Sequence, residues 1–132
     1  MPLVSVIMPA YNAMEFLESS VRSVLQQTFR DYELILVDDV SMDDTRDMIR
    51  KLASEDSRIR PLFLEENKGS AGARNMALQR ASGRIIMFLD SDDIWLPEKM
   101  ASQLAFMEEK QAPVVFSAYR RMTEGGELRG VV

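Results

Sequence analysis

The sequence contains neither cysteine nor histidine. Without cysteine, the chain can form no disulfide framework and no thiolate metal site. Without histidine, it can carry no Ser-His-Asp or Cys-His catalytic arrangement, and it lacks the usual ligands of zinc sites. Any acid–base chemistry therefore falls to Asp, Glu, Lys or Tyr.

Basic charge and long apolar runs are also scarce. The chain has 16 basic and 21 acidic residues and a net charge of -5, whereas a nucleic-acid surface requires a basic footprint. The apolar stretches fall well short of the roughly 18 residues that a membrane span requires, and no basic segment precedes an apolar one at the N-terminus. We therefore expect a cytoplasmic protein that binds no nucleic acid and has no signal peptide or transmembrane segment.

The chain is long and apolar enough for one globular domain. Of its 132 residues, 46% are apolar and 28% are charged, which suffices for a hydrophobic core. Apolar runs typical of strands alternate with segments of helical spacing. Strands are expected at residues 3–8, 34–37, 59–64, 84–89, 114–119 and 128–132, and helices at 15–27, at 43–54, from the loop 65–75 to about 80, and from 97 to the stop at Pro113. This order predicts an α/β fold with a Rossmann-like, mostly parallel sheet and helices on both faces.

Three local signals refine this prediction. Pro61 lies within the strand at 59–64, and because proline cannot donate a ladder hydrogen bond, we expect that strand at a sheet edge. Ser41, followed by Asp44 three positions later, resembles a capping box for the helix at 43–54, with Asp in place of Glu or Gln. Gly125-Gly126 is typical of a hairpin turn before the last strand.

The most informative stretch is an apolar strand that is followed directly by a cluster of acidic residues. Residues 85–89 are apolar, and Asp90, Ser91, Asp92 and Asp93 follow at once, while the next basic residue is Lys99. Crowded carboxylates repel one another, and a bound Mg²⁺ or Mn²⁺, which prefers oxygen ligands, would offset that cost. The alternative is a solvated acidic turn, because Asp and Ser are ordinary turn residues.

Two other predicted strands end in polar residues. Pro9-Ala10-Tyr11-Asn12 follows the first strand and Asp38-Asp39 follows the second. The carboxyl ends of neighbouring parallel strands meet at one edge of a sheet, where ligands bind. An aromatic ring there can stack on a base, a carboxylate can accept hydrogen bonds from base or ribose, and paired acids can hold a metal on a diphosphate. Together the three strand ends favour a nucleotide site, although each alone is compatible with a turn.

The small-residue loop 69–72 is a weaker signal. A helix N-terminus attracts anions, and small residues permit close approach of the backbone, but a plain turn with tight helix packing explains the loop equally well. Arg74, one helical turn later, could supply the positive charge that a diphosphate needs in a chain with an acidic total.

These segments, in this order and spacing, resemble the family 2 inverting glycosyltransferases of the GT-A fold. The resemblance rests on residues 4–12 (VSVIMPAYN), residues 37–45 (VDDVSMDDT), Asn67-Lys68-Gly69 with Ala73-Arg74-Asn75, and Asp90-Ser91-Asp92-Asp93. It covers essentially the whole chain. It implies a nucleotide-diphospho-sugar donor, most often a UDP-sugar, a Mn²⁺ or Mg²⁺ cofactor, and hexosyl transfer with inversion to a glycan or lipid-linked acceptor.

The resemblance also implies residue roles. Pro9, Ala10 and Tyr11 would line the base, with Tyr11 packed on the ring, and Asp39 would accept a hydrogen bond from the uracil ring nitrogen. Asp38 and Asp93 would support the site. The resemblance places Arg74 beside the nucleotide or its diphosphate. In the Asp-x-Asp motif, Asp90 would face the ribose and Asp92 would bind the metal, with Ser91 between the two acids contacting the nucleotide.

The sequence departs from the family pattern in two places. Val40 stands where the family usually has glycine, and because a β-branched residue resists positive φ, we expect a slightly altered turn after Asp39. The family's acceptor-binding half, with its catalytic base, is expected beyond Val132, so residues 1–132 would form the donor-binding domain of a truncated GT-A fold. The intact enzyme would serve cell-envelope polysaccharide synthesis, as a cytoplasmic protein or at the inner face of the membrane.

Three alternatives remain at this point. The chain could be a non-catalytic nucleotide-binding or regulatory module of the same fold. A response-regulator receiver domain also pairs acids after one strand with an Asp after a later one, but here a whole strand and helix precede Asp38, and too little chain follows Asp90. A sugar-phosphate nucleotidyltransferase would need a Gly-rich basic loop after the first strand, where residues 9–12 read Pro-Ala-Tyr-Asn.

Overall fold

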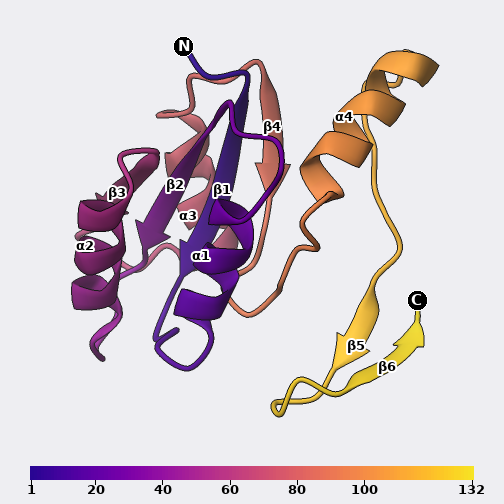
Figure 1. Ribbon diagram of the computed structural model, residues 1–132. Coiled ribbons are helices and arrows are strands. Elements are labelled where there is room, and N and C mark those ends of the chain that lie inside the picture. Colours follow the sequence, from indigo (N-terminus) through magenta and orange to yellow (C-terminus); the bar gives the residue numbers. More distant parts are fainter.

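A four-stranded parallel sheet forms the centre of the structure, a computed structural model that describes all residues from 1 to 132 (Figure 1). Its strands are β1 (Val4–Ala10), β2 (Tyr32–Asp38), β3 (Ile59–Phe63) and β4 (Ile85–Phe88), in the spatial order β3-β2-β1-β4. Helices α1 (Leu17–Leu25), α2 (Thr45–Glu55) and α3 (Gly69–Leu78) connect consecutive strands, and α4 (Lys99–Lys110) follows β4. The predicted α/β fold is confirmed, and β3, which contains Pro61, lies at an edge as expected.

Helices cover both faces of this sheet, as the sequence predicted. Side chains alternate between the faces along each strand, so Val4, Val6 and Met8 pack with α1 and α2 in the larger core cluster, whereas Ile7 and Ile35 pack with α3 in the smaller one. In Figure 1, α1 and α2 lie in front of the sheet and α3 behind it. Each fully buried Val, Leu or Ile contributes about 1.5–3 kcal/mol of transfer free energy, which makes these two clusters the main source of stability.

A buried carboxylate lies near the amino end of the sheet, on the α3 face. Glu33 of β2 accepts hydrogen bonds from the Ser5 hydroxyl and from the backbone N–H and hydroxyl of Ser82, and it pairs with Arg60. Burial by itself would raise the pKa of Glu33, but these hydrogen bonds outweigh it and lower the pKa to about 2. The charged form is therefore the stable one, and it holds the loop between α3 and β4 against β1 and β2.

Gly83 completes this junction because its backbone lies directly on β1. A Cβ at this position would lie 2.5 Å from the Ser5 nitrogen and 2.6 Å from the Val4 carbonyl carbon. No side chain fits against backbone atoms at those distances. Gly83 therefore permits the close approach of the loop before β4 to β1.

The C-terminal part of the chain differs from the prediction. Residues 114–119 do not form a fifth strand; instead β5 (Arg120–Met122) and β6 (Leu128–Val131) pair as a separate antiparallel hairpin. The run is apolar and β-prone, but strand propensity is realised only where a partner strand and a packed face exist, and here Val114 and Phe116 are 78% and 91% exposed. The predicted hairpin turn at Gly125-Gly126 does separate β5 from β6, and α4 and this hairpin lie to one side of the sheet, beyond β4 (Figure 1). None of the four helices combines the length and the apolar character that crossing a membrane requires.

Replacing Glu33 tests the buried carboxylate. Because its pKa falls from 4.5 to about 2 on folding, its stabilising contribution is complete above pH 4.5 and is lost as the pH falls toward 2. Glu33→Gln should lower the free energy of unfolding at pH 7 by about 3 kcal/mol and should flatten its dependence on pH between those limits. Urea unfolding at neutral and acidic pH measures both effects, with Glu109→Gln, an exposed acid on α4, as the control. Equal stability of the two variants at pH 7 would contradict the assignment.

Candidate functional site

One large cavity opens at the carboxyl edge of the sheet, with a volume of about 1030 Å³, enough for a ligand the size of a nucleotide. The parallel register creates it, since Ala10 at the end of β1 pairs with Asp38 at the end of β2, and Leu89 donates to the carbonyl of Ile7. Every residue that the sequence predicted for nucleotide or metal lines this cavity: Pro9, Ala10, Tyr11, Asp39, Arg74, Asp90, Ser91 and Asp92. The structure therefore brings the predicted set together, although no ligand is present to define the role of each member.

Asp39 joins β2 to the start of α3. Its side chain is buried, and its two carboxylate oxygens accept hydrogen bonds from the backbone N–H groups of Lys68 (2.7 Å) and Gly69 (2.8 Å). These are orphan donors at a helix N-terminus, whose positive dipole end favours a carboxylate. Asp39 thus caps α3 from a distance of 29 and 30 residues along the chain. Because each carboxylate oxygen has more than one lone pair, the residue keeps acceptor capacity toward the cavity it lines.

Asp38 faces a different environment and does not line the cavity. Its fully buried carboxylate accepts hydrogen bonds from the Arg46 guanidinium of α2 and from the backbone N–H of Ser41. Arg46 also donates to the carbonyl of Leu64, just beyond β3. This ion pair links α2 to the ends of β2 and β3, in agreement with the supporting role expected for Asp38.

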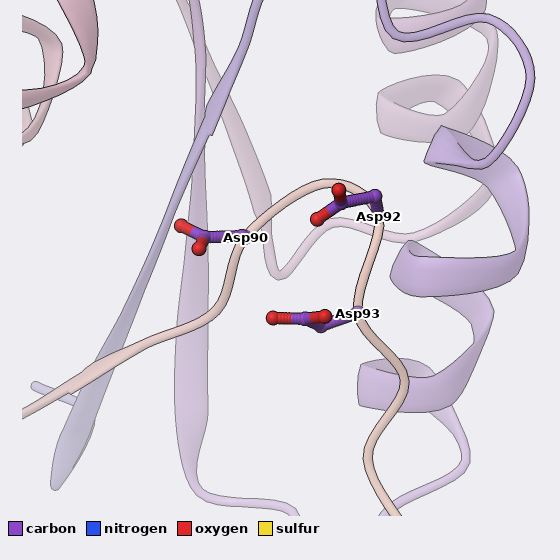
Figure 2. A group of neighbouring side chains, drawn as sticks. All are labelled: Asp90, Asp92 and Asp93. Atoms are coloured by element: carbon purple, nitrogen blue, oxygen red, sulfur yellow. The ribbon is translucent and has the colours of Figure 1, made fainter. Parts of the chain in front are cut away.

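The acidic turn after β4 gathers three carboxylates. Oxygen atoms of Asp90, Asp92 and Asp93 lie within 4.8 Å of one another, and the carboxylates of Asp92 and Asp93 point back across the turn toward Asp90 (Figure 2). Partial burial raises the pKa of Asp93, and the charges of Asp92 and Asp90 raise it further. Arg74 of α3 neutralises one member, since its guanidinium lies 2.6 Å from the Asp90 carboxylate. The remaining oxygen-only, negatively charged donors fit Mg²⁺ or Mn²⁺.

Three buried polar residues, two on α1 and one just after it, hold the acidic turn and the segment after it, and the sequence analysis missed them. The Ser20 hydroxyl donates to the carbonyl of Ser91 (2.9 Å), and the Ser23 hydroxyl accepts from the backbone N–H of Trp95 (3.1 Å). The Gln27 side chain donates to the carbonyl of Leu96 and accepts from the backbone N–H of Met100 in the first turn of α4. The signal in the sequence was the spacing, because these residues lie on the buried face of an otherwise apolar helical stripe. Hydrogen bonds, in addition to apolar contacts, therefore position the acidic turn on α1.

Val40 adopts a backbone conformation that valine rarely has. Its φ is +64°, so the expectation that a β-branched residue would alter this turn is wrong in one respect: the backbone remains left-handed. Hydrogen bonds on both sides hold it there. Before it, the Asp39 N–H donates to the carbonyl of Ala10 and Asn67 donates to the carbonyl of Asp39, and after it the Ser41 N–H donates to the Asp38 carboxylate. Such a conformation costs on the order of 1–3 kcal/mol, and it places strain directly beside the cavity.

The expected capping box at α2 is also wrong. The Ser41 hydroxyl accepts a hydrogen bond from the backbone N–H of Asn12 (2.9 Å) instead of capping the helix, and α2 begins at Thr45 without a side-chain cap from Asp44. A capping box satisfies orphan donors within one segment, whereas here a donor from another loop competes for the same oxygen. Ser41 therefore connects two loops at the cavity wall.

Several further residues line the cavity without having been assigned a role from the sequence. They are Asn12, Ala13, Glu15, Phe16, Val40, Met42, Asn67, Gly69, Ser70 and Ala73. Most of them come from the loops after β1 and β2 and from the loop before α3, and loop side chains carry no periodic signal in a sequence. Only Ala13, Glu15 and Phe16 lie outside the motif segments that the sequence analysis had noted.

The profile of glycosyl transferase family 2 matches residues 5–131. The chain belongs to this family. The Bacillus subtilis (strain 168) glycosyltransferase TuaG, named for teichuronic acid biosynthesis, is 49% identical over 125 residues, which cover 95% of this chain and 50% of TuaG. Escherichia coli WfgD, a UDP-Glc:alpha-D-GlcNAc-diphosphoundecaprenol beta-1,3-glucosyltransferase, is 48% identical over 117 residues, or 89% of this chain and 46% of WfgD. The chain thus spans about half the length of these curated relatives.

Solved structures agree with this family 2 assignment. The S. aureus TarS 1–349 structure in complex with UDP superposes with a TM-score of 0.75 at 33% identity, covering 82% of this chain and 32% of TarS 1–349. The mannosyltransferase PcManGT from Pyrobaculum calidifontis, in complex with GDP-Man and Mn²⁺, gives a TM-score of 0.75 at 28% identity, with 80% of this chain and 32% of that protein covered. The GT-A fold predicted from the sequence is therefore confirmed.

Substitutions at Val40 test the strain at the cavity wall. Glycine adopts positive φ freely, whereas alanine does not, so Val40→Gly should be more stable than Val40→Ala by about 1 kcal/mol. This order is the reverse of that found at ordinary positions, and comparing the two variants cancels most of the loss of the valine side chain. Chemical denaturation of both variants measures the difference. An alanine variant as stable as the glycine variant would show that φ at this position is not strained.

Proposed function

We propose that this chain is the donor-binding half of an inverting glycosyltransferase that uses a nucleotide-diphospho-sugar, most often a UDP-sugar, together with a divalent metal. The observation that carries the proposal is the single cavity in which an aromatic ring, a capped carboxylate, an arginine and an acidic turn converge. Family membership supports the reaction class, and the UDP complex of TarS supports the choice of nucleotide.

Each end of the cavity suits a different part of the donor. Tyr11, half-exposed beside Pro9 and Ala10, offers a ring face to the base, and aromatic rings prefer such offset stacking. Asp39, held rigidly by α3, accepts the hydrogen bond of the base's ring N–H. Rigid placement matters, because an acceptor that is already oriented loses little entropy when the ligand binds.

The opposite end suits the ribose and the diphosphate. Asp90 accepts hydrogen bonds from ribose hydroxyls, Ser91 lies between the two acids, and Arg74 brings positive charge to the diphosphate. Asp92 holds the divalent metal, either Mn²⁺ or Mg²⁺, with Asp93 in support. When bound, such a cation supplies the positive charge that stabilises a departing diphosphate. The PcManGT complex, which contains Mn²⁺, supports this cofactor.

We propose that the acceptor is bound by residues outside 1–132. Inverting transfer requires a base that takes the proton of the acceptor hydroxyl as that oxygen attacks the anomeric carbon. We propose that this base lies in the C-terminal part that the longer relatives possess, and that the acceptor is a glycan or a lipid-linked sugar, as the name of WfgD indicates for that enzyme. The 132-residue chain alone is then expected to bind donor and to turn over poorly.

The function is tested by nucleotide titration calorimetry. UDP, GDP and TDP are titrated into the wild-type chain and into Asp92→Asn, each with and without Mn²⁺. We expect UDP to bind most tightly, Mn²⁺ to strengthen binding, and Asp92→Asn to lose at least about tenfold in UDP affinity when Mn²⁺ is present, since it removes a charged ligand.

Asp47→Asn serves as the matched control, because Asp47 is an exposed acid on α2 that lies outside the cavity. It should bind UDP as the wild type does. Equal UDP affinity with and without Mn²⁺, in wild type and in Asp92→Asn alike, would remove the metal from the proposal. Preference for GDP over UDP would instead change the donor.

A further inference from the structure

Asn12 connects two loops of the cavity wall by a reciprocal pair of hydrogen bonds. Its backbone N–H donates to the Ser41 hydroxyl (2.9 Å), and its side-chain oxygen accepts from the backbone N–H of Met42 (2.8 Å). A third bond lies beside them, from the backbone N–H of Ala13 to the hydroxyl of Thr45 (2.9 Å). The loop after β1 and the loop after β2 therefore form one unit.

Ala13 of the first loop and Val40 of the second pack against the two core clusters, but the residues beside the hydrogen bonds are exposed. Tyr11, directly before Asn12, is 52% exposed, and Met42, which Asn12 contacts, is 88% exposed. Both residues line the cavity, Tyr11 from the first loop and Met42 from the second. At these two exposed positions, the hydrogen bonds between the loops constrain how far apart the side chains lie.

The backbone conformation explains why asparagine suits this position. Asn12 has a φ of +46°, a left-handed conformation that asparagine tolerates better than most residues. Glycine would tolerate this φ equally but would lack the side-chain acceptor. Aspartate keeps both the tolerance and an acceptor oxygen. Position 12 therefore combines two separable properties, a left-handed turn and a bridge to Met42.

We propose that Asn12 is a positioning residue for nucleotide binding, which fixes Tyr11 opposite Met42 before the base of the ligand enters. This inference rests on the proposed function, because it takes the ring at the Tyr11 wall to be a nucleotide base. A wall that is already in place spares the ligand the entropy of ordering two exposed loops. The bridge thus contributes to affinity through the spacing of the two loops that it joins.

The test separates a positioning role from a general loss of stability. Two probes are used: UMP, which contains the base and lacks the diphosphate, and inorganic pyrophosphate with Mn²⁺, which contains no base. NMR titrations give the dissociation constants of both probes, well below the melting temperature of every variant. Loss of positioning weakens UMP alone, whereas a damaged fold weakens both probes.

Asn12→Gly, which keeps the left-handed turn and the N–H bond to Ser41 but removes the hydrogen bond from Met42, should bind UMP between about threefold and tenfold more weakly than wild type, as expected for one hydrogen bond. Its affinity for Mn²⁺–pyrophosphate should stay that of the wild type. Asn12→Asp, which retains the acceptor oxygen, should recover most of the UMP affinity. UMP affinity unchanged in Asn12→Gly, or equal losses for the two probes, would overturn the positioning role.

The partner residue provides an independent check on the same bridge. Ser41→Ala removes the acceptor of the Asn12 N–H, and Ser41→Thr keeps it. If the two hydrogen bonds act as a unit, Asn12→Gly combined with Ser41→Ala should weaken UMP no further than Asn12→Gly does. Fully additive losses would contradict this. Failure of wild type to bind UMP or UDP would overturn the proposed function as well, whereas wild-type binding with unaffected variants would overturn only the role of Asn12.

Discussion

Parallel pairing of β1 with both β2 and β4 is the constraint on which the rest of the molecule depends. Because β1 lies between these two strands, the backbone hydrogen bonds that stabilise it also align their carboxyl ends. Ala10, Asp38 and the chain after Phe88 consequently meet at one edge. The side chains of the cavity do not create this alignment of strand ends, but their positions depend on it, as is general for ligand sites in open α/β sheets.

The carboxylates at this edge differ in whether a protein group pairs with them. Those with partners hold the structure together, and those without are available to bind a ligand. The buried Asp38 carboxylate pairs with Arg46, and Asp39 accepts hydrogen bonds from two backbone N–H groups at the start of α3. Asp90 pairs with Arg74 at the cavity wall. The acids that follow Asp90 have no such partner: no ion pair or side-chain hydrogen bond reaches Asp92. A carboxylate crowded by others and left without a cation is the group that gains most from a ligand of positive charge.

Apolar and polar contacts stabilise different parts of the cavity. The two core clusters hold helices to the sheet. The loops that line the cavity are aligned by directional hydrogen bonds from Ser20 on α1, from Gln27 just after α1, and between Asn12 and the loop after β2. The strained φ of Val40 persists within this network. Directional bonds fix orientation where apolar contact, which has no preferred direction, cannot.

The sequence alone determined the order of helices and strands as far as α4, the edge position of β3 and the eight predicted nucleotide and metal residues that line the cavity, because these follow from local periodicity and from which residues directly follow each strand. Tertiary structure decided what local patterns cannot encode. The Ser41 hydroxyl accepts from a distant loop and does not cap its own helix. Asp39 caps a helix that begins 30 residues later, and residues 114–118 of the apolar run find no strand partner. In each case the outcome depends on which donor, acceptor or strand edge lies nearby in space, and chain folding alone brings those groups together.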